Sequence, residues 1–365
     1  SFIVKGLEEG TYRLKVSADI PGYGIEENET TFIFIGDNNL LVEMYNTYDE
    51  HAPYVYINVL DQSTGSIVRF QYIADENGIY YTNLPNGTYA VMAWSNWNYR
   101  YYSERTDNFF ILEKNMQVNT GTVTVVQLNA SAGVSLTIQA YNINLQPQEG
   151  FWIDLYPSIG GFGLDVACTE SSGQAIIYVT PETYHIAARY DGAISYYLYV
   201  LNVDCTGSST VIFQPTAETT SNLTLSLHKT AEDQYGWAYI HPQSLPSPWG
   251  FGYRGEVIVT PDEWDVWGAW TFFWLENGYW DYSLWCEPTR VFNLTTPGSA
   301  ATFDFGGSLQ FTLSVDGSYS PGDTVQIFWN LTDSYGNVIS WIYEGAEHVS
   351  EPAIMAKIYG EKRIF

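Results

Sequence analysis

Basic side chains are scarce in this chain: 14 Lys and Arg stand against 41 Asp and Glu, which gives a formal net charge of −27. Proteins that bind nucleic acid neutralise phosphates with cationic side chains, so the composition excludes nucleic acid as a partner. An anionic membrane surface would repel the chain for the same reason. The acidic residues are scattered, which indicates a solvated surface. The alternative is an acidic habitat, where carboxyl groups with a pKa of about 4 would be largely neutral.

Long apolar segments are absent as well. No run of 18 apolar residues occurs and no signal peptide leads the chain, so the sequence predicts no membrane span in this stretch. No window sustains the i, i+3, i+4 spacing of a long helix. Tyr, Trp, Thr and Val favour strands, and the chain holds 30 Tyr and 13 Trp, which predicts an all-β protein.

Catalytic signatures are also missing. The five histidines are isolated, and no Gly-x-Ser-x-Gly, Gly-x-Gly-x-x-Gly or Walker sequence occurs. Glu263 and Asp265 would lie on one face of a strand, about 7 Å apart, but in so acidic a chain we interpret them as a solvated face rather than a glycosidase pair. The sequence therefore predicts a protein that is not an enzyme.

No cofactor is expected, and calcium is the one candidate ion. The acidic turns Asp75-Glu76-Asn77-Gly78 and Asp316-Gly317 lack the spacing of a calcium-binding loop. Asn77-Gly78 instead predicts a tight hairpin between strands at residues 69–74 and 79–82, because Asn-Gly accepts the positive φ of a type I′ turn.

Cysteine is limited to three residues. Cys168 and Cys205 fall in one predicted module, each near a strand end, and form a candidate disulfide for an oxidising compartment. Two buried thiols are an equal alternative. Cys286 is left over, as a buried thiol or an intermolecular link.

A short sequence motif, which we call the strand-entry phrase, recurs along the chain. Thr-Tyr or its equivalent follows an acidic, Asn- or Pro-containing turn and opens an apolar run, with its aromatic residue at Tyr12, Tyr89, Tyr184 and Trp264. The intervals are 77, 95 and 80 residues, and each suits one small β-sandwich. The sequence thus predicts tandem sandwiches, divided as residues 1–38 (closing strands of a partial module), 39–127, 128–217, 218–306 (aromatic-rich) and 307–365 (a partial module).

Several of these motifs resemble known families. One such resemblance is to carboxypeptidase-regulatory-like and collagen-adhesin B-type modules, and it is carried by residues 75–80 and Leu84-Pro85-Asn86-Gly87-Thr88-Tyr89. Residues 2–12 resemble the same motif. Ser320-Pro321-Gly322-Asp323 and residues 332–337 resemble macroglobulin-like or bacterial Ig-like domains. The resemblance implies transthyretin-like, Ig-like sandwiches of prokaryotic extracellular surface proteins, and it implies no activity. The Lys–Asn cross-link of some adhesin modules is not expected, because residues 128–217 contain no Lys.

Modification and contact sites follow from this expectation. An extracellular habit makes the Asn-x-Ser/Thr sequons candidate glycosylation sites, with chance occurrence as the alternative. Residues 235–285 hold eight of the 13 Trp and would be aromatic on both faces of a strand pair, so a second surface must cover one face. We rank a module–module contact first, subunit packing second and carbohydrate stacking third. The sequons are Asn28, Asn86, Asn129, Asn222, Asn293 and Asn330; the candidate interface or glycan contacts are Trp249, Trp267, Trp280 and Tyr282.

The function expected from these features is structural. The chain would be a subunit of an extracellular filament or surface layer, self-associating into a homopolymer or lattice. We expect it to begin and end within a module, through truncation or through donor-strand exchange. The rival hypotheses are an adhesin or glycan-binding array, and an accessory region of a secreted hydrolase. The candidate donor strand is Ala353, Ile354, Met355, Ala356, Lys357, Ile358 and Tyr359, and pairing within its own chain only would argue against that role.

Overall fold

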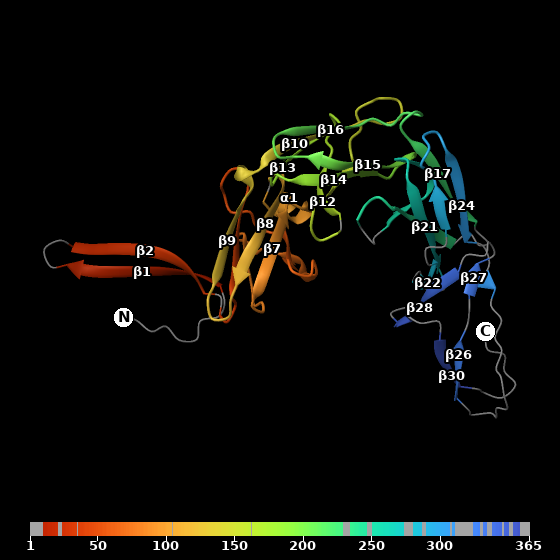
Figure 1. Ribbon diagram of the computed structural model, residues 1–365. Helices are drawn as coiled ribbons and strands as arrows, with labels where there is room; N and C mark the ends of the chain where they lie inside the picture. The colour runs from red at the N-terminus through yellow and green to blue at the C-terminus, as the bar shows by residue number, and fades with distance from the viewer. Residues whose placement is uncertain are drawn as a thin grey trace. The chain divides into compact units, whose positions relative to one another are not determined.

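The computed structural model of this chain shows strands almost throughout (Figure 1). A short helix, α1 (Trp97–Tyr102), and one 3-10 turn interrupt them. The all-β prediction is confirmed. The structure describes residues 10–20, 24–34, 36–103, 105–161, 163–228, 234–246, 250–273, 280–286, 290–306, 309–310, 324–328, 331–333, 338–344, 347–349 and 353–357.

The chain forms two compact units whose bounds interleave. The first comprises Ser1–Thr137, Ile176–Glu182 and Asp204–Thr210, and the second Ile138–Ala175, Thr183–Val203 and Val211–Phe365. The predicted division into five modules stays a prediction. The bounds of the two units do not coincide with it: one of them, between Thr137 and Ile138, falls inside the predicted module 128–217.

Three successive sets of strands repeat the same order, and we call them modules A, B and C. Module A holds β3 (Leu40–Tyr45), β4 (Tyr56–Asp61), β5 (Ile67–Ile73), β6 (Ile79–Thr82), β7 (Gly87–Trp94), β8 (Asn108–Val118) and β9 (Thr124–Asn129). Module B holds β10 (Val134–Ala140), β11 (Trp152–Tyr156), β12 (Leu164–Cys168), β13 (Gln174–Val179), β14 (Thr183–Tyr190), β15 (Ser195–Asp204) and β16 (Ser209–Phe213). Module C holds β17 (Ser221–His228), β18 (Gln234–Pro242), β19 (Phe251–Tyr253), β20 (Gly255–Val259), β21 (Glu263–Phe273), β22 (Trp280–Cys286), β23 (Arg290–Asn293) and β24 (Ala300–Gly306).

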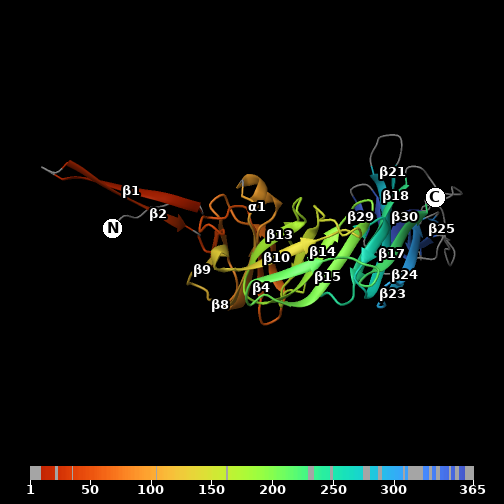
Figure 2. The same ribbon diagram turned by 90° about the horizontal axis from the view of Figure 1, so that it is seen from above.

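The remaining strands lie before and after these modules. β1 (Gly10–Ile20) and β2 (Gly24–Phe34) pair antiparallel along their whole length and lie side by side in both views (Figures 1 and 2). The later strands are β25 (Leu309–Gln310), β26 (Thr324–Phe328), β27 (Leu331–Asp333), β28 (Val338–Glu344), β29 (Glu347–Val349) and β30 (Ala353–Lys357).

Each module divides into a group of three strands and a group of four, and module C has one further strand, β23, which pairs with β21. The three-strand groups run β6-β3-β9, β13-β10-β16 and β20-β17-β24. The four-strand groups run β5-β4-β7-β8, β12-β11-β14-β15 and β19-β18-β21-β22. The four-strand group of one module and the three-strand group of the next belong to one seven-stranded sheet, because β8 pairs with β13 and β15 with β20.

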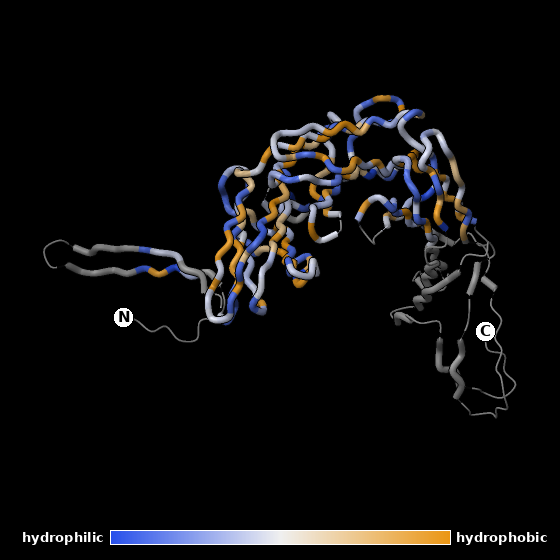
Figure 3. Tube along the Cα trace, in the orientation of Figure 1, coloured by the Kyte–Doolittle hydropathy of each residue, from blue (hydrophilic) through white to orange (hydrophobic). Residues whose placement is uncertain are grey.

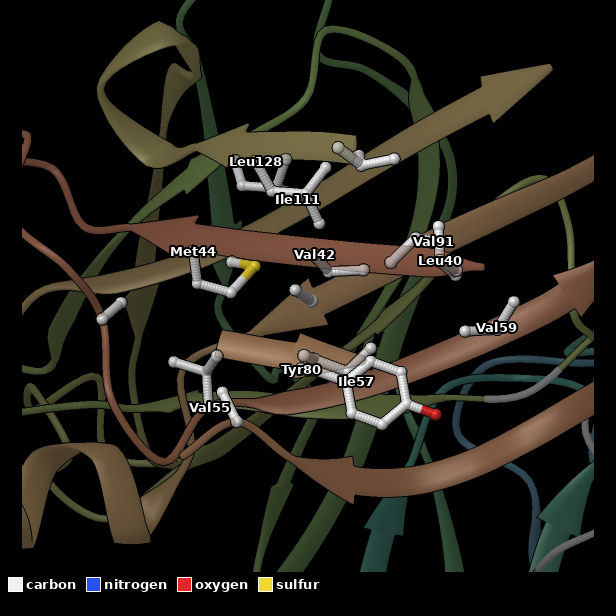
Figure 4. Close-up of a cluster of buried hydrophobic side chains, with 14 of the residues drawn as sticks. Leu40, Val42, Met44, Val55, Ile57, Val59, Tyr80, Val91, Ile111 and Leu128 are labelled. Carbon is white, nitrogen blue, oxygen red and sulfur yellow. The ribbon is translucent and has the colours of Figure 1, made fainter. Parts of the chain in front are cut away.

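The core of module A lies between its two groups of strands. Leu40, Val42 and Met44 alternate along β3 and are fully buried. Side chains from β4, β6, β7, β8 and β9 gather with them in one apolar cluster (Figure 4). Hydrophobic stretches, drawn in orange, alternate with hydrophilic ones along the chain in Figure 3.

The predicted hairpin at Asn77-Gly78 is wrong: a turn forms, but it is not of type I′, because Gly78 has a positive φ and Asn77 does not. Gly78 has φ +71°, and Asp75 accepts hydrogen bonds from the backbone of Asn77 and Ile79. The flanking strands do not pair with each other: β5 pairs with β4, and β6 pairs with β3 in the other sheet. The turn therefore crosses from one sheet to the other, because the local Asn-Gly signal specifies a reversal and not its partner strand.

Candidate functional site

A repeated junction joins the strands of successive modules. In the first unit, β13 runs parallel to β8, with Val179 opposite Phe110. Beyond this pair, the Thr180 N–H donates to the Phe110 carbonyl (3.1 Å), and the Thr180 hydroxyl accepts from the Leu112 N–H (2.8 Å). Glu182 forms an ion pair with Lys114 of β8. Thr180 thus continues the ladder with its side chain after the strand ends.

The second unit repeats this arrangement. β20 runs parallel to β15, with Val259 opposite Tyr197. The Thr260 N–H donates to the Tyr197 carbonyl (3.2 Å), and the Thr260 hydroxyl accepts from the Tyr199 N–H (2.9 Å). Both junctions have the sequence Val-Thr-Pro-acid, residues 179–182 and 259–262. Threonine suits a strand end, and the proline that follows stops the ladder because it has no N–H.

Asp262 anchors the second junction from a buried position. Its carboxylate accepts the Tyr199 hydroxyl (2.7 Å), the Ser244 N–H and hydroxyl (3.0 Å each) and the Glu263 N–H (2.7 Å). Burial and the neighbouring carboxylate raise the pKa of Tyr199, so its hydroxyl stays protonated and donates. Four donors thus converge on this buried carboxylate and fix its position at the junction.

The aromatic residue of the strand-entry phrase is part of the scaffold. Tyr89 and Trp264 are buried, and each bonds the backbone four residues earlier: the Tyr89 hydroxyl to the Pro85 carbonyl (2.9 Å), and the Trp264 indole N–H to the Thr260 carbonyl (3.1 Å). This fixes the turn before the strand much as a tyrosine corner does in Ig-like sandwiches. Trp264 is therefore a buried part of the second junction and offers no contact to another molecule.

One buried charge pair lies beside the second junction. Arg189 of β14 donates to Asp154 of β11 through Nε and through Nη2, the second at 2.9 Å from Oδ1. Asp154 is 1% exposed, and the Arg189 guanidinium lies 3.6 Å from the centre of the Phe251 ring of module C. Burial disfavours the charged guanidinium, but the Asp154 carboxylate outweighs it and raises the pKa of Arg189. The pair links two strands of module B to a ring of module C.

Tyrosine hydroxyls complete this interior. Tyr156 and Tyr197 bond each other through their hydroxyls (3.2 Å), and Tyr253 of module C donates to the Tyr196 carbonyl of module B (3.2 Å). Burial raises the pKa of Tyr156, Tyr197 and Tyr253, so they remain neutral donors. Tyr156, Tyr197 and Tyr253 belong to one buried cluster that continues from module B into module C.

Replacing Thr260 with valine is expected to weaken the second junction. The change keeps the shape but removes the acceptor of the Tyr199 N–H, and an unsatisfied buried donor costs about 1–3 kcal/mol. Amide hydrogen exchange should show faster exchange at Tyr199. Thr224→Val is the matched control, because Thr224 is exposed on β17. Equal exchange at Tyr199 in the two variants would contradict the role assigned to the Thr260 hydroxyl.

The predicted sequons differ in their surroundings. Asn86 and Asn293 are exposed, whereas Asn129 and Asn222 are half-buried and donate through Nδ2, the atom that would carry a glycan, to Asp49 and Glu256. The Nδ2 of Asn293 also donates, to Glu263 (3.3 Å). Asn86 is therefore the best-placed glycan acceptor. Of the other two, Asn28 has only its backbone described, in β2, and Asn330 lies outside the described residues.

Cys168 and Cys205 are not joined by a disulfide. Cys168 ends β12 and is half-buried, while Cys205 is buried beyond β15. Burial raises the pKa of the Cys205 thiol, which lowers its reactivity. The structure corresponds to the alternative of two thiols.

The predicted aromatic contact stays a prediction, because Trp267 is the one of its four residues whose side chain the structure describes. Trp267 is half-buried and stacks on Tyr239 (5.9 Å between ring centres), with its ring against the backbone of Gly250. Trp280 and Tyr282 lie in β22, where the structure describes only the backbone, and Trp249 lies outside the described residues.

The candidate donor strand is paired within the chain. Residues 353–357 form β30, which pairs antiparallel with β26 from Ala353 opposite Phe328 to Lys357 opposite Thr324. Ile358 and Tyr359 lie outside the described residues. This pairing counts against the donor-strand form of assembly.

Neither metal ligands nor a membrane helix emerge from the residues that the structure describes. Among them, no group of three or more His, Cys, Asp or Glu side chains is placed to hold a metal ion. None of the helices in the described ranges is long and apolar enough to cross a bilayer.

His241 makes stability depend on pH. It is buried in β18, burial lowers its pKa, and its Nε2 has no partner among the described residues. A depressed folded-state pKa means that the unfolded chain binds the proton more readily, so stability is complete above the unfolded pKa of about 6.5 and declines as pH falls below it. His241→Gln should flatten this slope in urea titrations between pH 7 and 5; His228→Gln, at a half-exposed site, is the control. An unchanged slope in His241→Gln would contradict this assignment.

Comparison with known proteins finds only distant likeness. No family model matches the chain, and no curated protein matches it. Among solved structures it is similar to the Bacillus anthracis TIE protein (11% identity, 83% of this chain and 61% of that one, TM-score 0.18). It is also similar to the shaft pilin SpaA of Lactobacillus rhamnosus GG (11%, 49% and 98%, TM-score 0.19) and to a streptococcal ancillary pilin (12%, 73% and 98%, TM-score 0.19). At these TM-scores the matches carry no inference about assembly or function.

Proposed function

We propose that this chain is a structural, non-enzymatic subunit of an extracellular surface assembly, a pilus-like fibre or a surface layer. The observation that supports this proposal is the repeated Val-Thr-Pro-acid junction, in which a strand of one module extends the sheet of the module before it. The proposal includes self-association into a homopolymer or lattice. It also includes the kinship with collagen-adhesin B-type modules that the sequence motifs imply.

The junctions support a structural role because they restrict the motion of one module relative to the next. Domains within a chain move relative to one another unless their interface is large and apolar. At the second junction, ladder hydrogen bonds, the Asp262 anchor and a shared apolar cluster act together. Because β13 and β20 cover the edges of β8 and β15, these edges cannot pair with strands of other molecules.

A specific observation favours a second candidate function, glycan binding. The loop that carries α1 leaves Tyr101 and Tyr102 exposed (70% and 59%), and Tyr48 nearby in the same unit is 60% exposed, with the Arg105 guanidinium 5.0 Å from its ring centre. Flat rings beside polar groups suit a sugar face. Glycan-array binding that is lost in Tyr101→Ala/Tyr102→Ala would support it, whereas equal binding by this variant would exclude the patch.

The structural proposal is tested by electron microscopy of the native material. Gold-labelled antibodies raised against the full chain should decorate filaments or a lattice on the cell surface. Labelled single particles of uniform size, with no filament or lattice, would overturn the proposal. Deleting the gene should remove the labelled structure and leave other surface layers intact.

A further inference from the structure

Strand β6 of module A occupies the place that β13 and β20 hold in modules B and C. Each is an outer member of a three-strand group, and Leu84, Val179 and Val259 each precede the aromatic residue of the strand-entry phrase by five positions. β13 and β20 use their outer edge to pair with β8 and β15. Among the described residues, β6 pairs with β3 alone.

Two backbone groups make the contact in the later modules. Tyr197 lies opposite Val259, so the parallel ladder uses the N–H of the residue after Val259 and the carbonyl of the residue before it. The first of these bonds is the one from the Thr260 N–H to the Tyr197 carbonyl. The corresponding groups in module A are the nitrogen of Pro85 and the carbonyl of Asn83.

Neither group of module A can receive a strand in this way. Pro85 has no N–H to donate. The Asn83 carbonyl accepts from Arg69 Nη2 at 2.7 Å. The same guanidinium donates to the Thr82 hydroxyl (2.9 Å) and to the Val68 carbonyl (2.8 Å), so β5 holds it across the end of β6.

We propose that Pro85 and Arg69 close the outer edge of β6, so that the edge-to-edge joining of modules cannot continue past module A on this side. Prolines and charged side chains on edge strands are known means of preventing strand addition. The occupant that is kept out is the β8 strand of a second copy of this chain whose β8 has not yet paired with its own β13. This inference goes beyond the proposed function and does not depend on it, because a monomer needs the same protection.

The test uses the full chain and a fluorescent peptide of residues 108–118, the sequence of β8. The double variant Arg69→Ser/Pro85→Thr restores the N–H and hydroxyl at position 85 and frees the Asn83 carbonyl. It should bind the peptide at least about tenfold more tightly than the wild type, the equivalent of 1.4 kcal/mol. Arg105→Ser, which removes an arginine away from this edge, is the control and should bind no better than the wild type.

Two outcomes would overturn the proposal. One is a wild type that binds the peptide as tightly as the double variant. The other is a double variant that keeps the wild-type circular dichroism spectrum and still shows no gain. If the double variant does not fold, Pro85→Thr alone is used, and hydrogen exchange at position 85 must slow when the peptide is added. The assembly tested by microscopy can fail without changing any of these results.

Discussion

Replacing Asp154 with alanine is expected to destabilise the second unit by about 3–5 kcal/mol, because it leaves the Arg189 guanidinium buried without its counter-charge. The guanidinium loses both hydrogen bonds to the carboxylate. Only 16% of the Arg189 side chain is exposed, and its guanidinium lies against the Phe251 ring. It also cannot relieve the charge by losing its proton at neutral pH.

Urea unfolding followed by tryptophan fluorescence measures this effect, since module C carries most of the tryptophans. The decisive control is the double variant Asp154→Leu/Arg189→Met. Replacing both members of a buried ion pair with apolar residues is often neutral or stabilising, so the double variant should be more stable than Asp154→Ala alone. If the single variant unfolds at the wild-type urea concentration, the pair does not stabilise the junction.

The strand content and the positions of the strand-entry aromatics could be predicted from the sequence, because both depend on local patterns. Tyr89 and Trp264 follow the turn that each helps to fix, so a window of a few residues contains both partners. The same locality explains the error at Asn77-Gly78. The dipeptide specifies a turn, but pairing with β3 and not β5 is decided by residues about 40 positions away.

The junctions could not be predicted, because their partners lie far apart in the sequence. Thr180 meets Leu112 from 68 residues away, and Thr260 meets Tyr199 from 61. The repeated Val-Thr-Pro-acid sequence was visible as a counterpart of the phrase, yet nothing local shows which strand it joins. A stronger signal was present in composition: Arg189 is the only Lys or Arg in residues 128–217. A solitary cation in an acidic, aromatic stretch is costly to bury unless a carboxylate faces it.

Replacing Trp264 with alanine should destabilise the second unit by about 3–5 kcal/mol, the range for removing a large buried aromatic. Its side chain is fully buried, and its ring meets that of Tyr197 edge to face, 5.1 Å between centres. The loss has two parts. One is the cavity in the cluster shared by modules B and C, and the other is the indole hydrogen bond to the Thr260 carbonyl.

Two further substitutions separate these parts. Trp264→Phe keeps an aromatic ring but removes the donor, whereas Trp264→Tyr introduces the residue that the phrase carries at Tyr89, where the hydroxyl reaches the carbonyl four residues earlier. If the bond to the Thr260 carbonyl fixes the junction, Trp264→Tyr should retain more stability than Trp264→Phe, and amide exchange at Tyr199 should stay slow only in the tyrosine variant. Equal stability and equal exchange in the two variants would show that Trp264 acts through its volume alone, and the hydrogen bond would then have no part in holding β20 against β15.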